Sequence, residues 1–379
     1  MERDLKVFCA AIVKGILRGI YFFLKLFPTH PGKVTFLSRQ SDEPSLDFLL
    51  LEEEIRRQCP DCETVFLCRR MGDGALALVR DFFVIVKQMK HLAESRVCIL
   101  DSYSIPVSIL KHKKELFVLQ IWHAMGAIKK FGYQSLGREG GRDARLARAM
   151  EMHKGYDAIV SGSQAMVPFF AEAFGAPRKK FLPVGMPRID YLLENEEKLR
   201  HVVRSQHPEW KGKTVVLYAP TFRRNREYQT DDLLRAMDWD KYVLIVKGHP
   251  LKELEVSDSQ AETCDSYSAM ELLPAADIVI TDYSAISIEA AALLKPVYFY
   301  VYDLEEYARD TGLNIDLEAE MPGCVYRDAA ALAAGMEREY PRDSIRRFRD
   351  TYVAQAAQKR LATKAIAACV LQRIKEAGR

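Results

Sequence analysis

Hydrophobic and polar positions follow each other along most of the chain in the rhythm of short strands separated by helices. From Lys33 onward, runs rich in Val, Ile, Leu and Phe alternate with longer segments whose apolar residues recur every three or four positions. The runs are mostly continuous rather than alternating, which is typical of parallel strands covered by helices on both faces. In the first half they lie at residues 33–39, 63–69, 96–101, 116–123, 157–163 and 180–185.

The same rhythm begins again after a polar, helical stretch at residues 188–208. The pattern therefore predicts an α/β protein of two Rossmann-like, doubly wound parallel-sheet domains that face a cleft, where the carboxyl ends of the strands would hold ligands. The predicted strands of the second half lie at residues 214–220, 241–248, 277–282 and 296–301. The predicted division is a helix at 1–28, a first domain at 29–208, and a second domain at 209–379 that ends in a closing helix at about 343–376.

The first segment, Leu5 to Phe27, is strongly apolar, but basic residues interrupt it. Lys14, Arg18 and Lys25 fall within roughly 40° of one another on a helix, which leaves a broad apolar face. We expect an amphipathic helix that lies in the plane of a membrane and docks on anionic lipid headgroups, and not a spanning helix. A signal peptide is disfavoured because basic residues enter the apolar region, whereas packing on the protein's own core is the simpler alternative.

Composition narrows the class of protein. The chain has 379 residues, 49% of them hydrophobic and 28% charged, so it can bury a substantial core and is long enough for two domains. Lys and Arg number 55 against 52 Asp and Glu, a net charge of +3 that provides no global field for nucleic acid. The 8 cysteines are scattered, and the CPDC at 59–62 has no second ligand pair. A reduced cytosolic chain is the simplest expectation, and a redox role for the CPDC is the less favoured alternative.

Two histidines follow predicted strands, one in each half of the chain. His123 stands at a strand-to-helix turn close to Gly126, and His249 follows Lys247 in the segment IVKGHP. An imidazole titrates near working pH and can act as a general base. A lone histidine in such a place is more often structural, but two in the same topological position are harder to dismiss.

Two further polar groups end strands of the second half. Thr221 and Arg223 follow the strand at 214–220, and an arginine fork matches phosphate oxygens, although such loops are usually only solvated. The TDYS at 281–284 opens a helix whose first N–H groups predict a phosphate site, against the plainer interpretation of a helix cap. Glu289 lies one turn beyond and is placed either to reach ribose hydroxyls or to face solvent.

Several catalytic signatures are missing from the sequence. It contains no G-x-x-x-x-G-K-[ST], no G-x-G-x-x-G after a strand, no G-x-S-x-G and no H-E-x-x-H. The acidic DWD at 238–240 precedes a strand and is interpreted as a turn. Kinase, dinucleotide oxidoreductase, α/β-hydrolase and zinc protease classes are therefore disfavoured.

Several segments together resemble the CDP-glycerol glycerophosphotransferase family, the primases and polymerases of wall teichoic acid, which have a GT-B-like fold. The segments include QIWHAMGAIKKFGY, VGMPRIDYL, LYAPTFRRN, KGHP and ADIVITDYSAISIEAAALL, and the likeness runs from about residue 116 to 323. The resemblance implies transfer of glycerol phosphate from CDP-glycerol to a hydroxyl of an undecaprenyl-diphosphate-linked saccharide, with release of CMP. It implies an acceptor-side first domain, a donor-binding second domain, and a peripheral enzyme on the cytoplasmic face of the cell membrane.

The resemblance also assigns roles residue by residue. His123 corresponds to the family's base and His249 to a second catalytic histidine near the donor phosphates. The donor-binding positions are Thr221, Arg223, Thr281, Asp282, Tyr283, Ser284, Ala285 and Glu289. Candidate contacts to phosphate or acceptor are Lys129, Arg188, Asp190 and Lys247. No metal ligand, tightly bound cofactor or nucleic-acid partner is expected.

Two departures from the family pattern bear on the donor. Ala124 replaces a glycine after the first histidine, and residues 311–314 read TGLN where the family has an arginine and aromatics. CDP-ribitol is therefore kept as an alternative donor. A nucleotide-sugar glycosyltransferase of GT-B type, and a non-catalytic scaffold that binds the lipid carrier, are the other two hypotheses.

Overall fold

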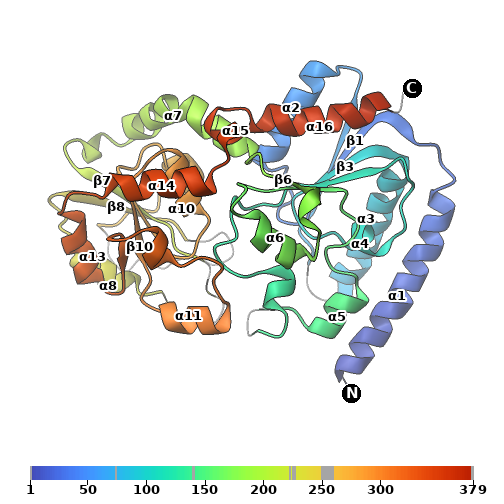
Figure 1. Cartoon of the computed structure of the whole chain (residues 1–379), viewed down its shortest axis with the longest axis horizontal. Coiled ribbons are helices and arrows are strands. Elements are labelled where there is room, and N and C mark those ends of the chain that lie inside the picture. The colour runs from blue at the N-terminus through green and yellow to red at the C-terminus, as the bar shows by residue number, and fades with distance from the viewer. Residues whose placement is uncertain are drawn as a thin grey trace. The chain divides into compact units, whose positions relative to one another are not determined.

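The computed structural model describes residues 2–72, 75–138, 141–221, 223, 228–248 and 260–376, with the side chains of 2–6 and 75–78 left out. The chain forms two compact units (Figure 1). Unit 1 comprises residues 1–124, 131–188 and 361–379, and unit 2 comprises residues 125–130 and 189–360. Both units are parallel α/β structures, which confirms the predicted fold class.

Unit 1 is built on a six-stranded parallel sheet in the order β2-β1-β3-β4-β5-β6. Helices α2 and α16 cover one face, where Phe48, Leu51, Ile366 and Val370 pack on the strands, and α3 lies on the other face (Figure 1). The strands are β1 (His30–Ser38), β2 (Glu63–Cys68), β3 (Ser95–Leu100), β4 (Phe117–Gln120), β5 (Ala158–Val160) and β6 (Phe181–Leu182). The helices are α1 (Glu2–Leu24), α2 (Leu46–Gln58), α3 (Ala75–Glu94), α4 (Ile105–Ile109), α5 (Ala144–Ala149), α6 (Val167–Phe174) and α16 (Ala362–Glu376).

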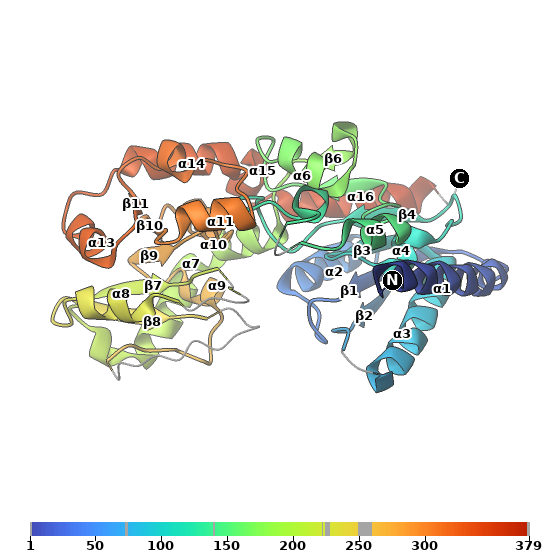
Figure 2. The ribbon, with the colours of Figure 1, turned by 90° about the horizontal axis from the view of Figure 1, so that it is seen from below.

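Unit 2 is built on a five-stranded parallel sheet in the order β11-β10-β9-β7-β8. Helices α8 and α13 pack on one face and α10 on the other (Figure 2). The strands are β7 (Thr214–Tyr218), β8 (Tyr242–Val246), β9 (Ile278–Thr281), β10 (Val297–Tyr300) and β11 (Val325–Tyr326). The helices are α7 (Pro187–Gln206), α8 (Thr230–Ala236), α9 (Ala269–Leu272), α10 (Ile286–Ala292), α11 (Leu304–Asp310), α12 (Leu317–Glu320), α13 (Ala329–Met336), α14 (Arg342–Tyr352) and α15 (Gln355–Gln358).

The two units differ from the predicted division in two places. The predicted boundary after residue 208 lies beyond α7, whereas the chain passes from one unit to the other after residue 188. The reason is that Arg200 and Arg204 of α7 donate to the carbonyl oxygens of Pro274 and Ala275 in unit 2. The predicted closing helix at 343–376 is three helices, since Val353 is extended and Arg360 has a φ of 58°. Its last part, α16, packs on unit 1.

Each sheet contains one point at which the strand order reverses, between β1 and β3 in unit 1 and between β7 and β9 in unit 2. In open parallel sheets this topological switch point leaves a crevice at the carboxyl ends of the strands, where ligands bind. In unit 1 the crevice is bordered by residues 39–40 and 101–103. In unit 2 it is bordered by residues 219–221, 223 and 282–284.

The basic side of α1 faces unit 1, which corrects the expectation that these cations meet lipid headgroups. Lys14 Nζ pairs with the carboxylate of Glu151 and donates to the Ala149 carbonyl at 3.1 Å. Arg18 Nε donates to the Ile109 carbonyl at 3.0 Å. These cations satisfy carbonyl and carboxylate groups of unit 1, so they hold the helix to the protein.

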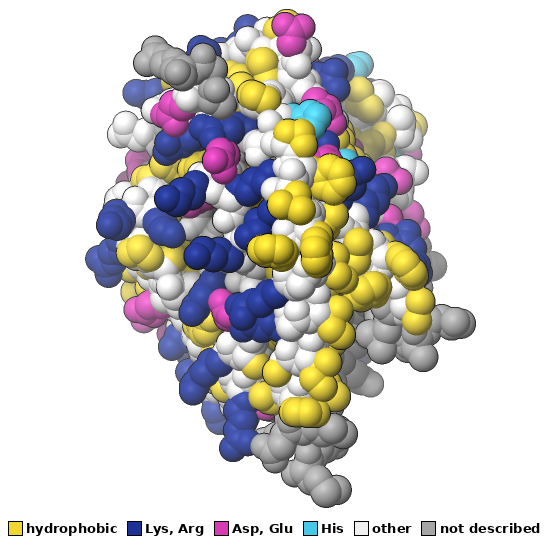
Figure 3. Space-filling view, turned by 90° about the vertical axis from the view of Figure 1, so that its right-hand side faces the viewer, with side chains coloured by type: hydrophobic (Ala, Val, Ile, Leu, Met, Phe, Trp, Pro, Cys, Tyr) yellow, Lys and Arg dark blue, Asp and Glu magenta, His cyan; other side chains and the backbone are white. Residues whose placement is uncertain are grey.

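The apolar side of α1 is turned outward instead. Figure 3 shows a band of hydrophobic side chains along this surface with Lys and Arg side chains beside it. The exposed apolar residues are Phe8, Ile12, Val13, Ile16, Phe22, Phe23, Leu26 and Phe27, joined by Val79, Phe82 and Phe83 of the neighbouring α3. By length and composition alone, Val7–Leu24 would also suffice to cross a membrane.

Cys59 and Cys62 form a disulfide at the end of α2, which differs from the expected reduced chain. The amide of Cys59 bonds to the Ile55 carbonyl and that of Cys62 to the Cys59 carbonyl, so a tight turn brings the two Cα atoms to 5.5 Å. Such a separation lies within the range that a disulfide requires.

Candidate functional site

His123 lies just past β4, at the carboxyl edge of the unit 1 sheet. Trp122 adopts a positive φ of 59°, and its amide bonds to Gln120 Oε1 at 2.8 Å, which turns the chain sharply before the histidine. Nδ1 of His123 lies 3.0 Å from the carbonyl oxygen of Asp101. Gln40 Nε2 also lies 3.2 Å from Nδ1, and a hydrogen bond donated from there would require the opposite tautomer. Donation from Nδ1 to the Asp101 carbonyl, which can only accept, places the basic lone pair on Nε2. This is the tautomer that a general base needs.

Asp101 itself is a buried carboxyl beside this histidine. Burial, with the nearby charge of Asp47, raises its pKa to about 6, although hydrogen bonds from Ser38 and Ser102 act in the opposite direction. Its Oδ1 has no hydrogen-bond partner. A carboxyl kept in so unfavourable a setting is typical of a functional site. Sequence reasoning missed it, although an acid directly after the apolar run of β3 was the available signal.

A cavity of about 350 Å³ occupies the switch point of unit 1. Its walls carry three arginines, Arg39, Arg70 and Arg142, together with Tyr103 and Trp122. Among the described residues, no Asp or Glu lines it. The sequence did not single out these arginines because they come from three loops that only the fold brings together.

The switch point of unit 2 is filled by a buried charge cluster around Arg223. Its guanidinium donates to Asp282 Oδ2 at 2.6 Å and to both carboxylate oxygens of Asp303, at 2.9 and 3.0 Å. Burial alone would lower the arginine pKa, but Asp282 and Asp303 outweigh it and raise that pKa. Asp282 also accepts from the amide of Thr221 at 2.8 Å. The charge of Arg223 is therefore neutralised inside the protein, and Asp303 is a member of the cluster that sequence reasoning missed.

The TDYS turn at 281–284 belongs to the same cluster. Thr281 Oγ1 donates to the Ala219 carbonyl at 2.7 Å, and Tyr283 Oη donates to Asp303 at 3.1 Å. The predicted open N–H groups of the following helix are already used, since residues 286–288 donate to Ser284 and Ala285 in a tightened first turn. The helix start is thus not the bare anion site that the sequence predicts. Glu289 is buried on α10 and does not face solvent.

Lys129 is brought to this cluster from the first half of the chain. Residues 125–130 belong to unit 2, where Lys129 pairs with Leu313 in an antiparallel bridge and the amide of Asn314 bonds to the Ile128 carbonyl at 2.8 Å. Burial lowers the pKa of Lys129, while Asp282 raises it. The departure at 311–314 is therefore the segment that positions Lys129.

The remaining predicted residues are scattered. Arg188 is held by Asp47, with its Nε 2.8 Å from Oδ2, so this charge is paired within unit 1. Asp190 is buried on α7. Lys247 Nζ donates to the Cys264 carbonyl at 3.3 Å, and His249 lies outside the described residues.

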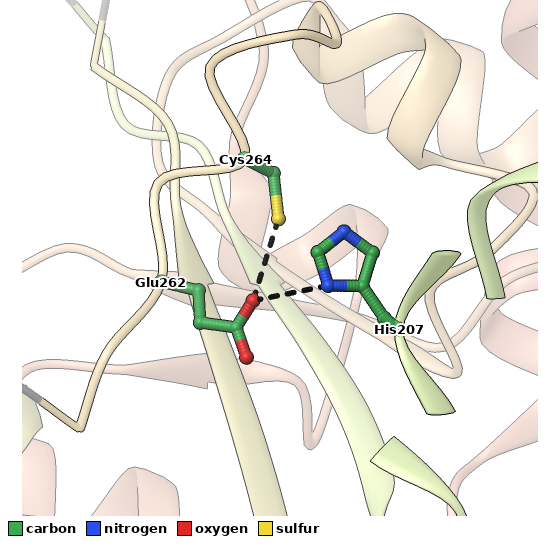
Figure 4. Close-up of side chains that lie close together, drawn as sticks. All are labelled: His207, Glu262 and Cys264. Carbon is green, nitrogen blue, oxygen red and sulfur yellow. Dashed lines mark hydrogen bonds and ion pairs between the residues drawn. The ribbon is translucent and has the colours of Figure 1, made fainter. Parts of the chain in front are cut away.

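A second cluster joins His207, Glu262 and Cys264 (Figure 4). His207 Nδ1 lies 3.5 Å and the thiol 3.7 Å from Glu262 Oε2, and such donors can hold zinc. However, Trp210 Nε1 donates to Glu262 at 2.7 Å, and burial with the charge of Glu262 raises the Cys264 pKa to about 12, which keeps the thiol protonated. We interpret the cluster as a hydrogen-bonded support for residues 260–264.

Comparison with known proteins places this geometry in a family. The CDP-Glycerol:Poly(glycerophosphate) glycerophosphotransferase family matches residues 20–367. The chain belongs to that family. The resemblance found in the sequence is thereby confirmed, and the protein is a transferase of the teichoic acid primase and polymerase group.

Individual relatives span most of the chain. The teichoic acid ribitol-phosphate primase of Bacillus spizizenii is 33% identical, covering 92% of this chain and 94% of its own length. The teichoic acid glycerol-phosphate primase of Bacillus subtilis is 31% identical, covering 71% of this chain and 72% of its own length. The solved structure of the wall teichoic acid polymerase TagF superposes with a TM-score of 0.73 at 18% identity, covering 99% of this chain and 98% of TagF. TagF thus shares the fold, which supports the predicted GT-B-like class.

Proposed function

We propose that the protein transfers a polyol phosphate from a CDP-activated polyol to a hydroxyl of a lipid-linked saccharide acceptor and releases CMP. The family match supports the reaction class, and the observation that carries the chemistry is the contact of His123 Nδ1 with the Asp101 carbonyl at 3.0 Å. A proton donated along this contact leaves the basic lone pair on Nε2, whereas donation from Gln40 Nε2, at 3.2 Å, would place the proton there instead. In this proposal unit 1 serves the acceptor and unit 2 serves the donor.

The proposed step is one in-line displacement at phosphorus. Nε2 of His123 takes the proton of the acceptor hydroxyl, whose oxygen forms a bond to the phosphorus that carries the polyol. The bond from that phosphorus to the bridging oxygen of CMP breaks, and the electron pair leaves with CMP. Phosphoryl transfer depends on positioning and charge stabilisation more than on covalent help from the protein.

On the donor side, the buried cluster supports a division of labour between its two cations. Arg223 is saturated by two carboxylates, so we assign it to shaping the loop at 219–223 and the TDYS turn. Lys129 forms no ion pair within the described residues, and its partly desolvated ammonium suits a donor phosphate. Thr221, residues 281–285, Glu289, Lys247 and His249 are retained as proposed donor-side residues.

Two donors are candidates. CDP-glycerol is the predicted donor and matches the description of the family. CDP-ribitol is favoured by one observation, because the ribitol-phosphate primase matches the chain over nearly its whole length. Purified protein should be incubated with CDP-glycerol, CDP-ribitol and a UDP-sugar in separate reactions containing a polyprenyl-diphosphate disaccharide. CMP release from either CDP-polyol supports the proposal, whereas turnover of the UDP-sugar alone would reject it.

We further propose that the apolar faces of α1 and α3 seat unit 1 on the cytoplasmic face of the cell membrane. Phe8, Phe22 and Phe23 of α1 are between 62% and 65% exposed, and Phe83 of α3 is 66% exposed. Apolar surface of this extent, beside Lys and Arg side chains, suits the boundary between acyl chains and anionic headgroups. The enzyme would thereby reach an acceptor that stays in the bilayer.

A further inference from the structure

Two cavities of unit 1 adjoin and differ in the polarity of their lining. The polar cavity at the switch point measures about 350 Å³, and a second cavity of about 490 Å³ lies between α1 and α5. Both are lined by Arg39, Tyr103, Arg142 and Met152, so the two cavities share a wall. A ligand with one charged and one apolar part could occupy both.

The shared wall is strongly cationic. The guanidinium groups of Arg39 and Arg142 lie 5.9 and 5.2 Å from the centre of the Tyr103 ring. Arg39 Nε is buried and has no hydrogen-bond partner, and neither arginine pairs with a carboxylate in the part of the chain that the structure describes. Burial, together with the charge of Arg142, lowers the pKa of Arg39. An anion between the two guanidinium groups would relieve their repulsion and satisfy the open donor.

The surface of the second cavity is mostly apolar, although Arg39, Arg142 and Asp143 also line it. Val13, at the exposed edge of α1, lines it together with Leu146 and Ala147 of α5. The one acid in its lining, Asp143, accepts hydrogen bonds from the amides of residues 145 and 146 and so caps α5. A hydrocarbon chain therefore fits this cavity beside the outward apolar face of α1.

We propose that these adjoining cavities bind the prenyl-diphosphate part of the acceptor, with the diphosphate between Arg39 and Arg142 and the first isoprene units between α1 and α5. This inference rests on the proposed function and adds the position of the acceptor. Trp122 lines the polar cavity, and its ring lies 4.2 Å from that of His123. A saccharide attached to the diphosphate would therefore extend past Trp122 towards the catalytic imidazole.

The test uses farnesyl diphosphate, a short prenyl diphosphate that needs no membrane, in equilibrium dialysis with the full-length protein. Arg142→Ala removes an exposed side chain and should leave folding intact. The loss of one charge-assisted contact should weaken binding by about tenfold or more. Arg148→Ala is the matched control, because Arg148 is likewise exposed but lies on α5 and outside both cavities, and it should bind as the wild type does. Val13→Asp should weaken farnesyl diphosphate but leave inorganic pyrophosphate binding unchanged.

Equal binding of farnesyl diphosphate by wild type and Arg142→Ala would overturn the inference, as would a wild type that does not bind it. Donor turnover separates this failure from that of the proposed function. Transfer from a CDP-polyol with an acceptor KM unchanged in Arg142→Ala rejects the cavity and keeps the reaction. Arginine-dependent binding of farnesyl diphosphate without transfer from either CDP-polyol keeps the cavity and rejects the reaction.

Discussion

The arginines at the two switch points differ in whether carboxylates pair with them. In unit 2, Arg223 is buried and bonded to Asp282 and Asp303, so the charge of the arginine is fully paired by carboxylates. In unit 1, Arg39 and Arg142 stand around a cavity without carboxylate partners among the described residues. The same residue type at the same topological position thus does two jobs.

The difference separates residues that build a site from residues that bind a ligand. A buried, fully paired arginine holds loops in place but has little left to offer a phosphate. An arginine whose donors remain open gains from any anion that enters. The helix α1 follows the same rule, since its paired cations fix it to unit 1 and its unpaired apolar side remains for a partner.

The largest expected effect comes from removing the paired arginine. Arg223→Met leaves Asp282 and Asp303 buried without their cation, which should lower the free energy of unfolding by about 3–5 kcal/mol. The matched control is Arg235→Met, because Arg235 pairs with Asp232 at the surface of the same unit and should cost less than about 1 kcal/mol. Urea unfolding of both variants measures the two losses. Similar losses would show that the cluster does not hold unit 2 together.

The second effect concerns the base. His123→Ala should fold normally and lower turnover by about 10²-fold or more, as expected for the loss of a general base. His201→Ala, an exposed position on α7, serves as the control. The measurement is the initial rate of CMP release under saturating donor and acceptor. Near-normal turnover of the variant would remove His123 from the mechanism.

The third effect is the pH dependence of the free energy of unfolding. Two buried groups of unit 1 change it in opposite directions, so that their effects nearly cancel. Burial raises the pKa of Asp101 from 3.8 to about 6. Its contribution to the free energy of unfolding is therefore full below pH 4 and is lost as the pH rises through 6. Burial, with the charges of Arg142 and His123, lowers the pKa of His153 from 6.5 to about 3. Its contribution to the free energy of unfolding is therefore present above pH 6.5 and is lost as the pH falls towards 3.

Removing one of these two groups should make the pH effect of the other group measurable. Asp101→Asn should gain on the order of 2 kcal/mol at pH 7. The variant should then lose more stability than the wild type between pH 7 and pH 4, because only His153 remains. Thermal melts across this pH range test both statements, and parallel profiles for the two proteins would contradict them.

The smallest effect is at the membrane. Phe23→Ser on the outward side of α1 should weaken binding to anionic vesicles by roughly tenfold, since one buried Phe contributes about 1.5–3 kcal/mol. Leu49→Ser, an exposed apolar position on α2, is the control and should bind as the wild type does. Vesicle co-sedimentation gives both partition coefficients. If both variants bind alike, the α1 face is not the contact.

Local sequence patterns predicted more of the architecture than of the candidate site. The apolar runs predicted all the strands up to Tyr300, because a buried parallel strand needs an uninterrupted run of residues such as the VVLY of β7. The division at residue 188 was missed, because it depends on where Arg200 and Arg204 find carbonyl partners. No local pattern reports such long-range bonds.

The candidate site was predicted in part for the same reason. His123 and the TDYS turn are visible because they directly follow strands. Whether Arg223 is open or paired depends on Asp303, which lies 80 positions away in the sequence. The arginine cavity of unit 1 likewise requires three loops to meet, so only the fold reveals it.

The central claim is that unit 1 binds the acceptor and unit 2 binds the donor. The most direct test of it is a pair of Michaelis constants measured in two variants. Arg142→Ala should raise the KM for the lipid-linked acceptor about tenfold and leave the KM for the CDP-polyol unchanged, whereas Lys129→Ala should do the reverse. If either variant shifts both constants together, or if Arg142→Ala affects only the donor, then unit 1 is not the acceptor side and the account is wrong.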